Sequence, residues 1–509
     1  MIGLTPAGLR QDDVVAVARD DAEVALGAEA RARMAASAEA VDAHVASGEP
    51  VYGVTTGFGS LANTSIPVER TAEMQLALLR SHAAGMGPPV EREVVRAMLV
   101  LRARSLALGY SGARPEVVEA ILGLLAARLT PVVPEHGSLG ASGDLAPLAH
   151  CALTLVGEGD LIDGEGHVRP AAEALHEAGL APLELRAKEG LALINGTDGM
   201  LGMLTLALHD LRALLRIADV AAATSVEALL GTDRAFAEDL IALRPQVGQD
   251  ASATNLRALL AGSPIVASHR EGDDRVQDAY SLRCAPQVHG AARDGVDYAS
   301  SIADRELGAA IDNPMVLPDG RVESCGNFHG APLAQACDLL AIAVADLGAI
   351  AERRTDRLLD ARRSEGLPPF LAPDAGVNSG LMIAHYTQAA LVAENRRLAV
   401  PASVDTLPTS AMQEDHVSLG WAAARKLRTA VANLRRILAV ELTCAARGLD
   451  LRAPLAPAAG TGAAHAAMRT VVAGPGPDRQ VAPELAAAER LLADGSLLHA
   501  VVAAVGPLA

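Results

Sequence analysis

The spacing of apolar residues along the chain predicts mostly helices. Apolar side chains recur three or four positions apart, as they do on one face of an α-helix. In the first part of the chain this pattern predicts helices over residues 12–45, 67–82, 91–108 and 115–129. A glycine or a proline follows each run within a few residues, and both residue types end helices.

After residue 199 the helical runs become longer. Residues 200–230, 332–363 and 416–447 contain little that would break a helix, so we expect them to be parallel pillars of one bundle. Residues 451–483 are rich in Ala, Gly and Pro and predict a loose excursion. A last helix is expected over residues 484–505.

The fold expected from this pattern is all-α, that is, mainly helical. We divide it into an N-terminal helical region, residues 1–199, and a region of long-helix bundle and C-terminal helices, residues 200–509. Polar motifs concentrate in the connectors between the pillars. A group of arginines mixed with acids is typical of a solvated or subunit-facing surface; its members are Arg353, Arg354, Arg357, Arg362 and Arg363.

Charge and composition narrow the class of partner. The 509 residues carry a formal net charge of -18, which argues against nucleic acid or an anionic membrane and favours a small molecule. The longer apolar runs contain charges such as Asp198, Asp338 and Asp346, so none predicts a membrane span. The five cysteines are scattered and no signal-peptide pattern is seen, so we expect a cytoplasmic protein.

A glycine-rich loop over residues 137–144 has the most distinctive chemistry. Within it, Gly143 has an amide nitrogen that no Cβ shields, and the nitrogen could attack the carbonyl of Ala141. The hydroxyl of Ser142 could then leave as water, which would create an exocyclic methylidene, an electrophile that no ordinary side chain supplies. Taken alone, the segment also fits a phosphate-binding loop or a simple turn before the helix that begins near Asp144.

Three other residues stand at places where loops meet helices. Tyr52 lies in a loop with three glycines, residues 51–59, where it could point into a cleft or serve as a packing anchor. His82 ends a predicted helix, where a histidine often only complements the helix dipole. Asn195 follows a short apolar run and can both donate and accept hydrogen bonds.

Together and in this order, the motifs resemble those of the aromatic amino acid ammonia-lyases. The resemblance extends from Tyr52 to Trp421 and centres on Gly-Ser-Leu-Gly-Ala-Ser-Gly-Asp-Leu-Ala-Pro-Leu, residues 137–148. It implies that Ala141, Ser142 and Gly143 form 4-methylideneimidazol-5-one (MIO), with no external cofactor. It also implies a mostly helical homotetramer with a central bundle, in the superfamily of fumarase and aspartase.

The resemblance also implies roles for single residues. Tyr52 matches the tyrosine that acts on the β-proton of the substrate, and Tyr280 and Glu414 join it as catalytic candidates. His82 matches a position that distinguishes histidine from bulkier aromatic substrates, and Glu414 matches the acid that faces the imidazole. Arg283 matches the arginine that binds the substrate carboxylate. The remaining matches lie beside the MIO or in the same motifs: Asn195, Gln277 and Phe328.

The members of the family that act on histidine resemble this chain most. We therefore expect L-histidine to be deaminated to trans-urocanate and ammonia, the first step of histidine degradation to glutamate. The alternatives are a tyrosine or phenylalanine ammonia-lyase, an MIO aminomutase, a silent binding protein on the same scaffold, or a lyase of the fumarase type without MIO. We predict no metal ligands, and neither nucleic acid nor membrane as partner.

Overall fold

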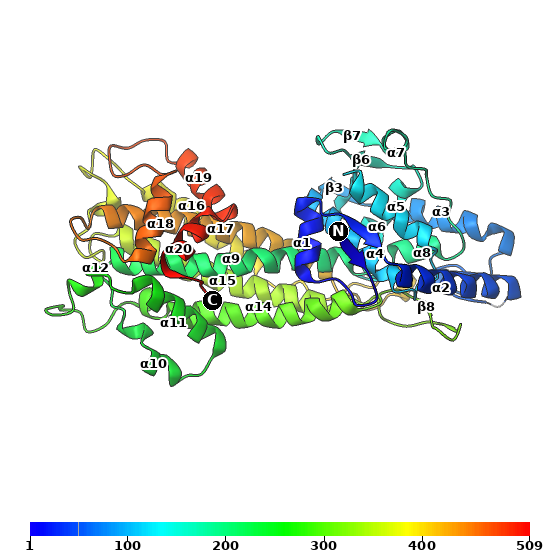
Figure 1. Cartoon of the computed structure of the whole chain (residues 1–509), viewed down its shortest axis with the longest axis horizontal. Helices are drawn as coiled ribbons and strands as arrows, with labels where there is room; N and C mark the ends of the chain where they lie inside the picture. The colour runs from blue at the N-terminus through cyan, green and yellow to red at the C-terminus, as the bar shows by residue number, and fades with distance from the viewer. Residues whose placement is uncertain (49) are drawn as a thin grey trace. The chain divides into compact units, whose positions relative to one another are not determined.

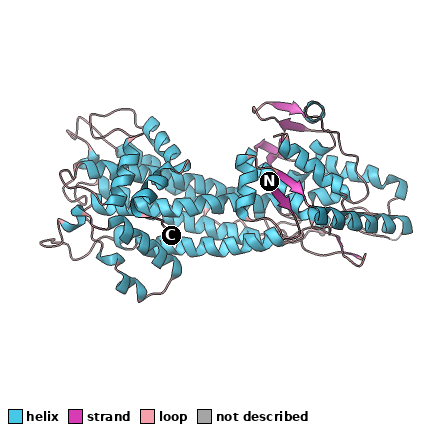
Figure 2. Ribbon diagram, in the orientation of Figure 1, coloured by secondary structure: helices cyan, strands magenta, loops and turns pink. Residues whose placement is uncertain are grey.

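Helices make up most of the structure, a computed structural model that describes residues 1–48 and 50–509. Figure 2 shows helices throughout and only a few short strands. The order of the elements can be followed by colour in Figure 1. The prediction of a mainly helical fold is confirmed.

The chain packs into two compact units. Unit 1 consists of Met1–His209, Ala299–Asp338 and Pro401–Arg425. Unit 2 consists of Asp210–Tyr298, Leu339–Val400 and Lys426–Ala509. All the strands that the structure describes belong to unit 1. The division at residue 199 that the sequence suggested stays a prediction.

Unit 1 is built around α4 (Arg92–Ala107), in which every residue from Val94 to Ala107 is buried. The helices predicted in this part of the chain are present, with short strands between them. The other helices are α1 (Gln11–Asp20), α2 (Ala28–Ser47), α3 (Thr71–His82), α5 (Pro115–Ala126), α6 (Leu145–Leu155), α7 (Ala171–Glu177) and α8 (Glu189–Ile194).

The strands of unit 1 form four small sheets. One pair is parallel, β1 (Ile2–Leu4) with β2 (Val24–Leu26). The others are antiparallel: β3 (Met86–Pro89) with β5 (Pro134–His136), β4 (Thr130–Pro131) with β6 (Asp160–Ile162) and β7 (Val168–Pro170), and β8 (Met315–Val316) with β9 (Val322–Glu323). The β3–β5 pair leads directly into the glycine-rich loop and so fixes where that loop begins.

Four long helices contribute residues to both units: α9 (Asp198–Ala228), α14 (Ala285–Gly308), α15 (Ala331–Leu359) and α17 (Gly420–Asp450). The sequence pattern predicted three of them to within a few residues at most ends. It did not predict α14, which contains two internal glycines, Gly290 and Gly295.

The rest of unit 2 differs in two places from the sequence prediction. The segment expected to be loose contains a regular helix, α18, and the expected last helix is two helices, α19 and α20, because Gly495 between them has φ +79°. The remaining helices are α10 (Glu238–Ala242), α11 (Val247–Leu260), α12 (Pro264–Ala267), α13 (Tyr280–Arg283), α16 (Met382–Leu398), α18 (Ala459–Arg469), α19 (Ala482–Ala493) and α20 (Ser496–Val505).

Buried charges join the long helices inside unit 2. Arg354 of α15 is fully buried and donates to Oε2 of Glu441 of α17 at 3.0 Å. Ser225 of α9 donates to the other oxygen of the same carboxylate at 2.8 Å. The expectation that Arg354 belongs to a solvated surface was therefore wrong, because its position on α15 faces the neighbouring helices.

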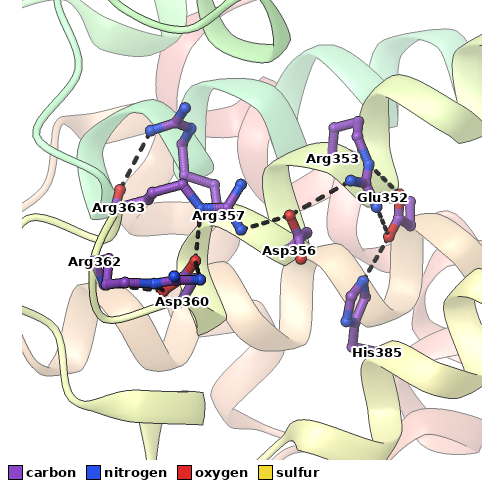
Figure 3. Close-up of polar contacts among 8 residues, drawn as sticks. All are labelled: Glu352, Arg353, Asp356, Arg357, Asp360, Arg362, Arg363 and His385. Carbon is purple, nitrogen blue, oxygen red and sulfur yellow. Dashed lines mark hydrogen bonds and ion pairs between the residues drawn. The ribbon is translucent and has the colours of Figure 1, made fainter.

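Three other members of that arginine group, Arg353, Arg362 and Arg363, do pair with acids along α15 and the turn after it, as Figure 3 shows. Arg353 contacts Glu352, which His385 also contacts. Arg362 and Arg363 both contact Asp360, at 3.0 Å and 2.8 Å. These pairs neutralise most of the positive charge at this end of α15.

One helix, α15, is long and apolar enough to cross a membrane by length and composition alone. In its most apolar window 56% of the residues are buried inside the structure. Core helices of soluble bundles satisfy the same criterion, so the finding is weak evidence for a membrane span.

Replacing Arg354 by Met should destabilise the protein strongly. The change leaves the buried carboxylate of Glu441 without its cation, which typically costs about 3–5 kcal/mol. Urea unfolding should show a lower midpoint. Adding Glu441→Met to the same chain should recover most of the loss, and Arg362→Gln, at an exposed ion pair, should leave the midpoint unchanged. Equal midpoints for Arg354→Met and wild type would contradict the structural role of this pair.

Candidate active site

The glycine-rich loop is held in place by the backbone of Gly196. The N–H of Asp144 donates to the carbonyl of Gly196 at 2.7 Å, and Gly143 forms a parallel bridge with the same residue. Gly143 has φ +75°, and a Cβ placed on it would lie 2.1 Å from the Gly196 oxygen. Only glycine fits at this position.

Asp144 connects the loop to α9. It stands at the N-cap position of α6, as the sequence suggested, but its carboxylate caps a different helix. Oδ2 accepts hydrogen bonds from the N–H groups of Gly199 and Met200 at 2.9 Å and 3.0 Å, in the first turn of α9. Ser138 donates to Oδ1 at 3.0 Å. Complete burial raises the pKa of Asp144 to about 7, even though these donors lower it.

The opposite side of the loop is fixed by the segment before α17. Ser418 donates its hydroxyl to the carbonyl of Gly140 at 3.1 Å, and the N–H of Leu419 donates to the carbonyl of Leu139 at 2.9 Å. Ala141, Ser142 and Gly143 are thus held between two anchored ends.

A pocket of about 510 Å³ opens beside Ser142, and all the residues that line it belong to unit 1. Four residues proposed from the sequence share it with Ser142: Tyr52, His82, Asn195 and Glu414. The rest of the wall is mainly apolar and includes Phe58, Met74, Leu78, Leu145, Leu191 and Ile194. The pocket therefore combines an apolar wall with a few polar groups, the usual composition of a small-molecule site.

Tyr52 has its hydroxyl fixed by the backbone. The N–H of Gly59 donates to the Tyr52 oxygen at 3.0 Å, and the ring of Phe58 packs edge-on with its centroid 6.3 Å away. Burial, together with the negative charge of Glu414, raises the pKa of Tyr52 above its ordinary value, while the Gly59 hydrogen bond lowers it. Tyr52 is therefore a neutral phenol in the free pocket.

His82 lies on the last turn of α3 and faces the same pocket. Its Nδ1 lies 3.0 Å from the carbonyl oxygen of Leu78, so Nδ1 carries the proton and Nε2 is the acceptor. Burial is the main cause that lowers the pKa of His82. The ring presents a hydrogen-bond acceptor rather than a positive charge.

Glu414 is held by a tight turn. Thr409 donates its hydroxyl to Oε2 at 2.8 Å, and the two residues form an isolated β-bridge. Between them Ser410, Ala411 and Met412 all have φ between +49° and +72°, a conformation that costs energy in residues other than glycine. The N–H of Ser60 donates to Oγ of Ser410 at 3.2 Å, which joins this turn to the loop of Tyr52.

Asn195 leaves an unused acceptor in the pocket wall. Its Nδ2 donates to the backbone carbonyl of Asn313 at 2.8 Å. The backbone carbonyl of Asn195 accepts a hydrogen bond from buried Arg102 at 2.8 Å. Asn313 is fixed in turn by Asp312, which pairs with Lys188 at 2.7 Å in full burial. Within the described part of the chain, the buried Oδ1 of Asn195 has no hydrogen-bond partner.

The other proposed residues lie elsewhere. Gln277, Tyr280 and Arg283 line a separate pocket of about 450 Å³ in unit 2. Phe328 is half-buried in the segment before α15 and lines neither pocket. The sequence reasoning missed Asn313 and Ser410 as lining residues. Asn313 stands in a polar motif, Asp-Asn-Pro, that could have suggested it, whereas Ser410 has no such motif.

No group of three or more His, Cys, Asp or Glu side chains that could hold a metal ion occurs among residues 1–48 and 50–509. The polar groups that line the Ser142 pocket include a phenol, a neutral imidazole, a carboxylate, the amides of Asn195 and Asn313, and several serine hydroxyls. Such a set can accept and donate protons and can orient a polar ring.

Comparison with known proteins identifies the family. The sequence model of the aromatic amino acid lyases matches residues 9–470. The chain belongs to the aromatic amino acid lyase family. A curated histidine ammonia-lyase from Streptomyces avermitilis is 61% identical over 504 residues, which cover 99% of this chain and 98% of the relative.

Solved structures of the aromatic amino acid lyase family share the fold. A histidine ammonia-lyase from Trypanosoma cruzi superimposes with a TM-score of 0.91 at 41% identity, covering 99% of this chain and 95% of that one. A tyrosine aminomutase from Streptomyces globisporus gives a TM-score of 0.94 at 36% identity, with complete coverage of both chains. The backbone is thus common to lyases and mutases of the family, and substrate choice depends on side chains.

Replacing Glu414 by Gln should lower the pKa of Tyr52. The substitution keeps the size of the side chain and removes the negative charge that disfavours the phenolate. The measurement is the phenolate absorbance during an alkaline titration, with Tyr52→Phe in both backgrounds as the control that isolates Tyr52. A Tyr52 pKa that does not change, or rises, would show that Glu414 does not act on Tyr52.

Proposed function

We propose that this protein converts L-histidine to trans-urocanate and ammonia. The observation that carries the proposal is the polar end of the Ser142 pocket, where the neutral His82 and the carboxylate of Glu414 stand together. Both groups accept hydrogen bonds, so the ring that matches them is a protonated imidazole, whose two N–H groups can serve both. The curated relatives named histidine ammonia-lyase support the same substrate.

We propose further that Ala141, Ser142 and Gly143 form the MIO group by cyclisation and dehydration, with no external cofactor. The fit of the loop supports this: Gly143 has no room for a Cβ, and both ends of the segment are anchored. A fixed loop lowers the entropy cost of bringing the Gly143 nitrogen to the Ala141 carbonyl. Once formed, the group supplies the electrophile that the deamination needs.

Tyr52 is the base that we propose for the β-proton. Its raised pKa in the free pocket opposes this role, but two features offset it. The N–H of Gly59 donates to the oxygen and stabilises the phenolate. A protonated imidazole ring bound against Glu414 would balance its negative charge, which otherwise raises the pKa of Tyr52.

His82 and Glu414 set the specificity for imidazole. Nε2 of His82 accepts from a ring N–H, and Glu414 pairs with the ring from another direction. A phenyl ring would cover Nε2 of His82 and the second carboxylate oxygen of Glu414 and give neither a hydrogen bond, and such losses cost about 1–3 kcal/mol each. Asn195 lines the same pocket and is a further candidate for contact with the substrate.

Arg283 is the proposed ligand of the substrate carboxylate, since a guanidinium binds a carboxylate through two parallel hydrogen bonds. We propose a cytoplasmic homotetramer in which Arg283, with Tyr280 and Gln277, serves the Ser142 pocket of another copy. Phe328 keeps its proposed place against the MIO in that assembly.

The second candidate is a tyrosine-specific reaction of the same family. Its support is the close match to the backbone of a tyrosine aminomutase. The polar pair of His82 and Glu414 disfavours it, because a phenol ring offers only one polar group at its far end.

The intact protein should weigh two waters less than its encoded chain, because cyclisation and dehydration each remove one. The Ser142→Ala variant has no hydroxyl to eliminate, so it should retain at least one of these two waters. It should also form no urocanate. Intact mass spectrometry of both proteins tests this. A wild-type mass equal to that of the unmodified sequence would exclude the MIO.

Replacing His82 by Leu should reduce kcat/KM for histidine by roughly 10- to 100-fold, the effect of losing one hydrogen bond to a polar substrate group. Any trace activity on phenylalanine should fall far less. Urocanate absorbance and cinnamate absorbance measure the two reactions, with His499→Leu, at an exposed position, as the matched control. A wild type that prefers tyrosine or phenylalanine would overturn the substrate assignment and leave the MIO intact.

A further inference from the structure

The pocket in unit 2 that contains Arg283 carries more positive charge than one carboxylate requires. We call it the arginine pocket. Five arginines and only two acids line it, in a chain whose net charge is -18. Its charged lining residues are Arg275, Asp278, Arg283, Arg357, Arg362, Arg363 and Glu365.

Three of the five arginines already have carboxylate partners. Arg275 contacts Asp273 at 2.7 Å and lies 3.6 Å from Asp278. Arg362 and Arg363 pair with acids at the end of α15, as Figure 3 shows. Paired arginines contribute little net charge to the pocket.

Arg283 and Arg357 remain. Arg283 donates through Nε to the carbonyl of Asp278 at 2.9 Å, and its guanidinium stacks on Tyr280 at 4.5 Å from the ring centroid. Arg357 makes one weak bond, from its Nη1 to the carbonyl of Arg363 at 3.5 Å, which Figure 3 also shows. Neither has a carboxylate partner among the residues that the structure describes.

Two guanidiniums that lack carboxylate partners line the same pocket, and together they match an oxyanion with two negative charges. A single carboxylate needs only one guanidinium, that of Arg283, and this leaves Arg357 without an anion. A phosphate has enough oxygens to accept bidentate pairs from both. The volume of about 450 Å³ is ample for a phosphate and for a small ester of it.

We propose that the arginine pocket binds a phosphate-class dianion between Arg283 and Arg357, and that the bound dianion competes with the substrate carboxylate for Arg283. The first part stands on the pocket alone. The second part rests on the proposed function, because it needs Arg283 to hold the substrate.

Binding is tested on the full-length protein by calorimetric titration with inorganic phosphate at constant ionic strength, with chloride as the balancing salt. Wild type should show saturable binding. Arg357→Gln should weaken it by roughly tenfold or more, the loss of a charged hydrogen-bonding group. Arg357→Lys should recover part of the affinity. The matched control Arg362→Gln, whose guanidinium is already paired with Asp360, should bind as wild type does.

The same variants are then assayed for urocanate formation. Phosphate should raise the KM of wild type for histidine without changing kcat, and Arg357→Gln should relieve this inhibition while keeping its kinetics in phosphate-free buffer. A parallel titration with glycerol phosphate distinguishes a free phosphate from a phosphate monoester, and tight binding of either one supports the site.

The proposal would be overturned if neither probe bound saturably to wild type. It would also be overturned if Arg357→Gln and Arg362→Gln weakened phosphate binding equally. An increased KM of Arg357→Gln for histidine in phosphate-free buffer would contradict it too, because Arg357 would then bind the substrate. Phosphate binding without any urocanate formation would instead refute the proposed function and leave the anion site standing.

Discussion

The contact between Gly143 and Gly196 is the constraint on which the rest of unit 1 depends. It brings two backbones so close that no Cβ fits on Gly143, and the next residue, Asp144, uses its carboxylate to cap α9. The first long helix and the glycine-rich loop are therefore positioned by two adjacent residues, Gly143 and Asp144. Ser418 performs the equivalent task at the start of α17, so the loop is fixed to two of the long helices at once.

Buried charged side chains in unit 1 hold the part of the pocket wall that contains Asn195 and Asn313. Arg102 and the pair of Lys188 and Asp312 are almost fully removed from water, and they bond to the backbone that carries Asn195 and Asn313. Buried ion pairs seldom add much net stability, because desolvation offsets their attraction. Their role here is to hold in place the backbone of two residues of the pocket wall, Asn195 and Asn313.

The sequence predicted the reactive loop and four of the residues that share its pocket, because each stands in a local motif or a recognisable resemblance. It could not predict contacts that depend on the path of distant segments. The carboxylate of Asp144 reaches a helix that begins at residue 198 rather than its own helix, and Ser410 reaches the loop of Tyr52 across most of the chain. Helix α14 was missed although it is amphipathic, because Gly290 and Gly295 inside it are residues that usually signal a break in a helix.

Burial acts on the two titrating rings of the pocket in opposite directions, and this gives the free site its charge. It raises the pKa of Tyr52 and lowers that of His82, so each ring is neutral near neutral pH. Glu414 lines the same pocket, and its negative charge adds to the raised pKa of Tyr52. In the reaction proposed above, a substrate that places a positively charged group against Glu414 would offset this charge and make the phenolate of Tyr52 less costly to form. The proposed base would then be activated by the substrate on which it acts.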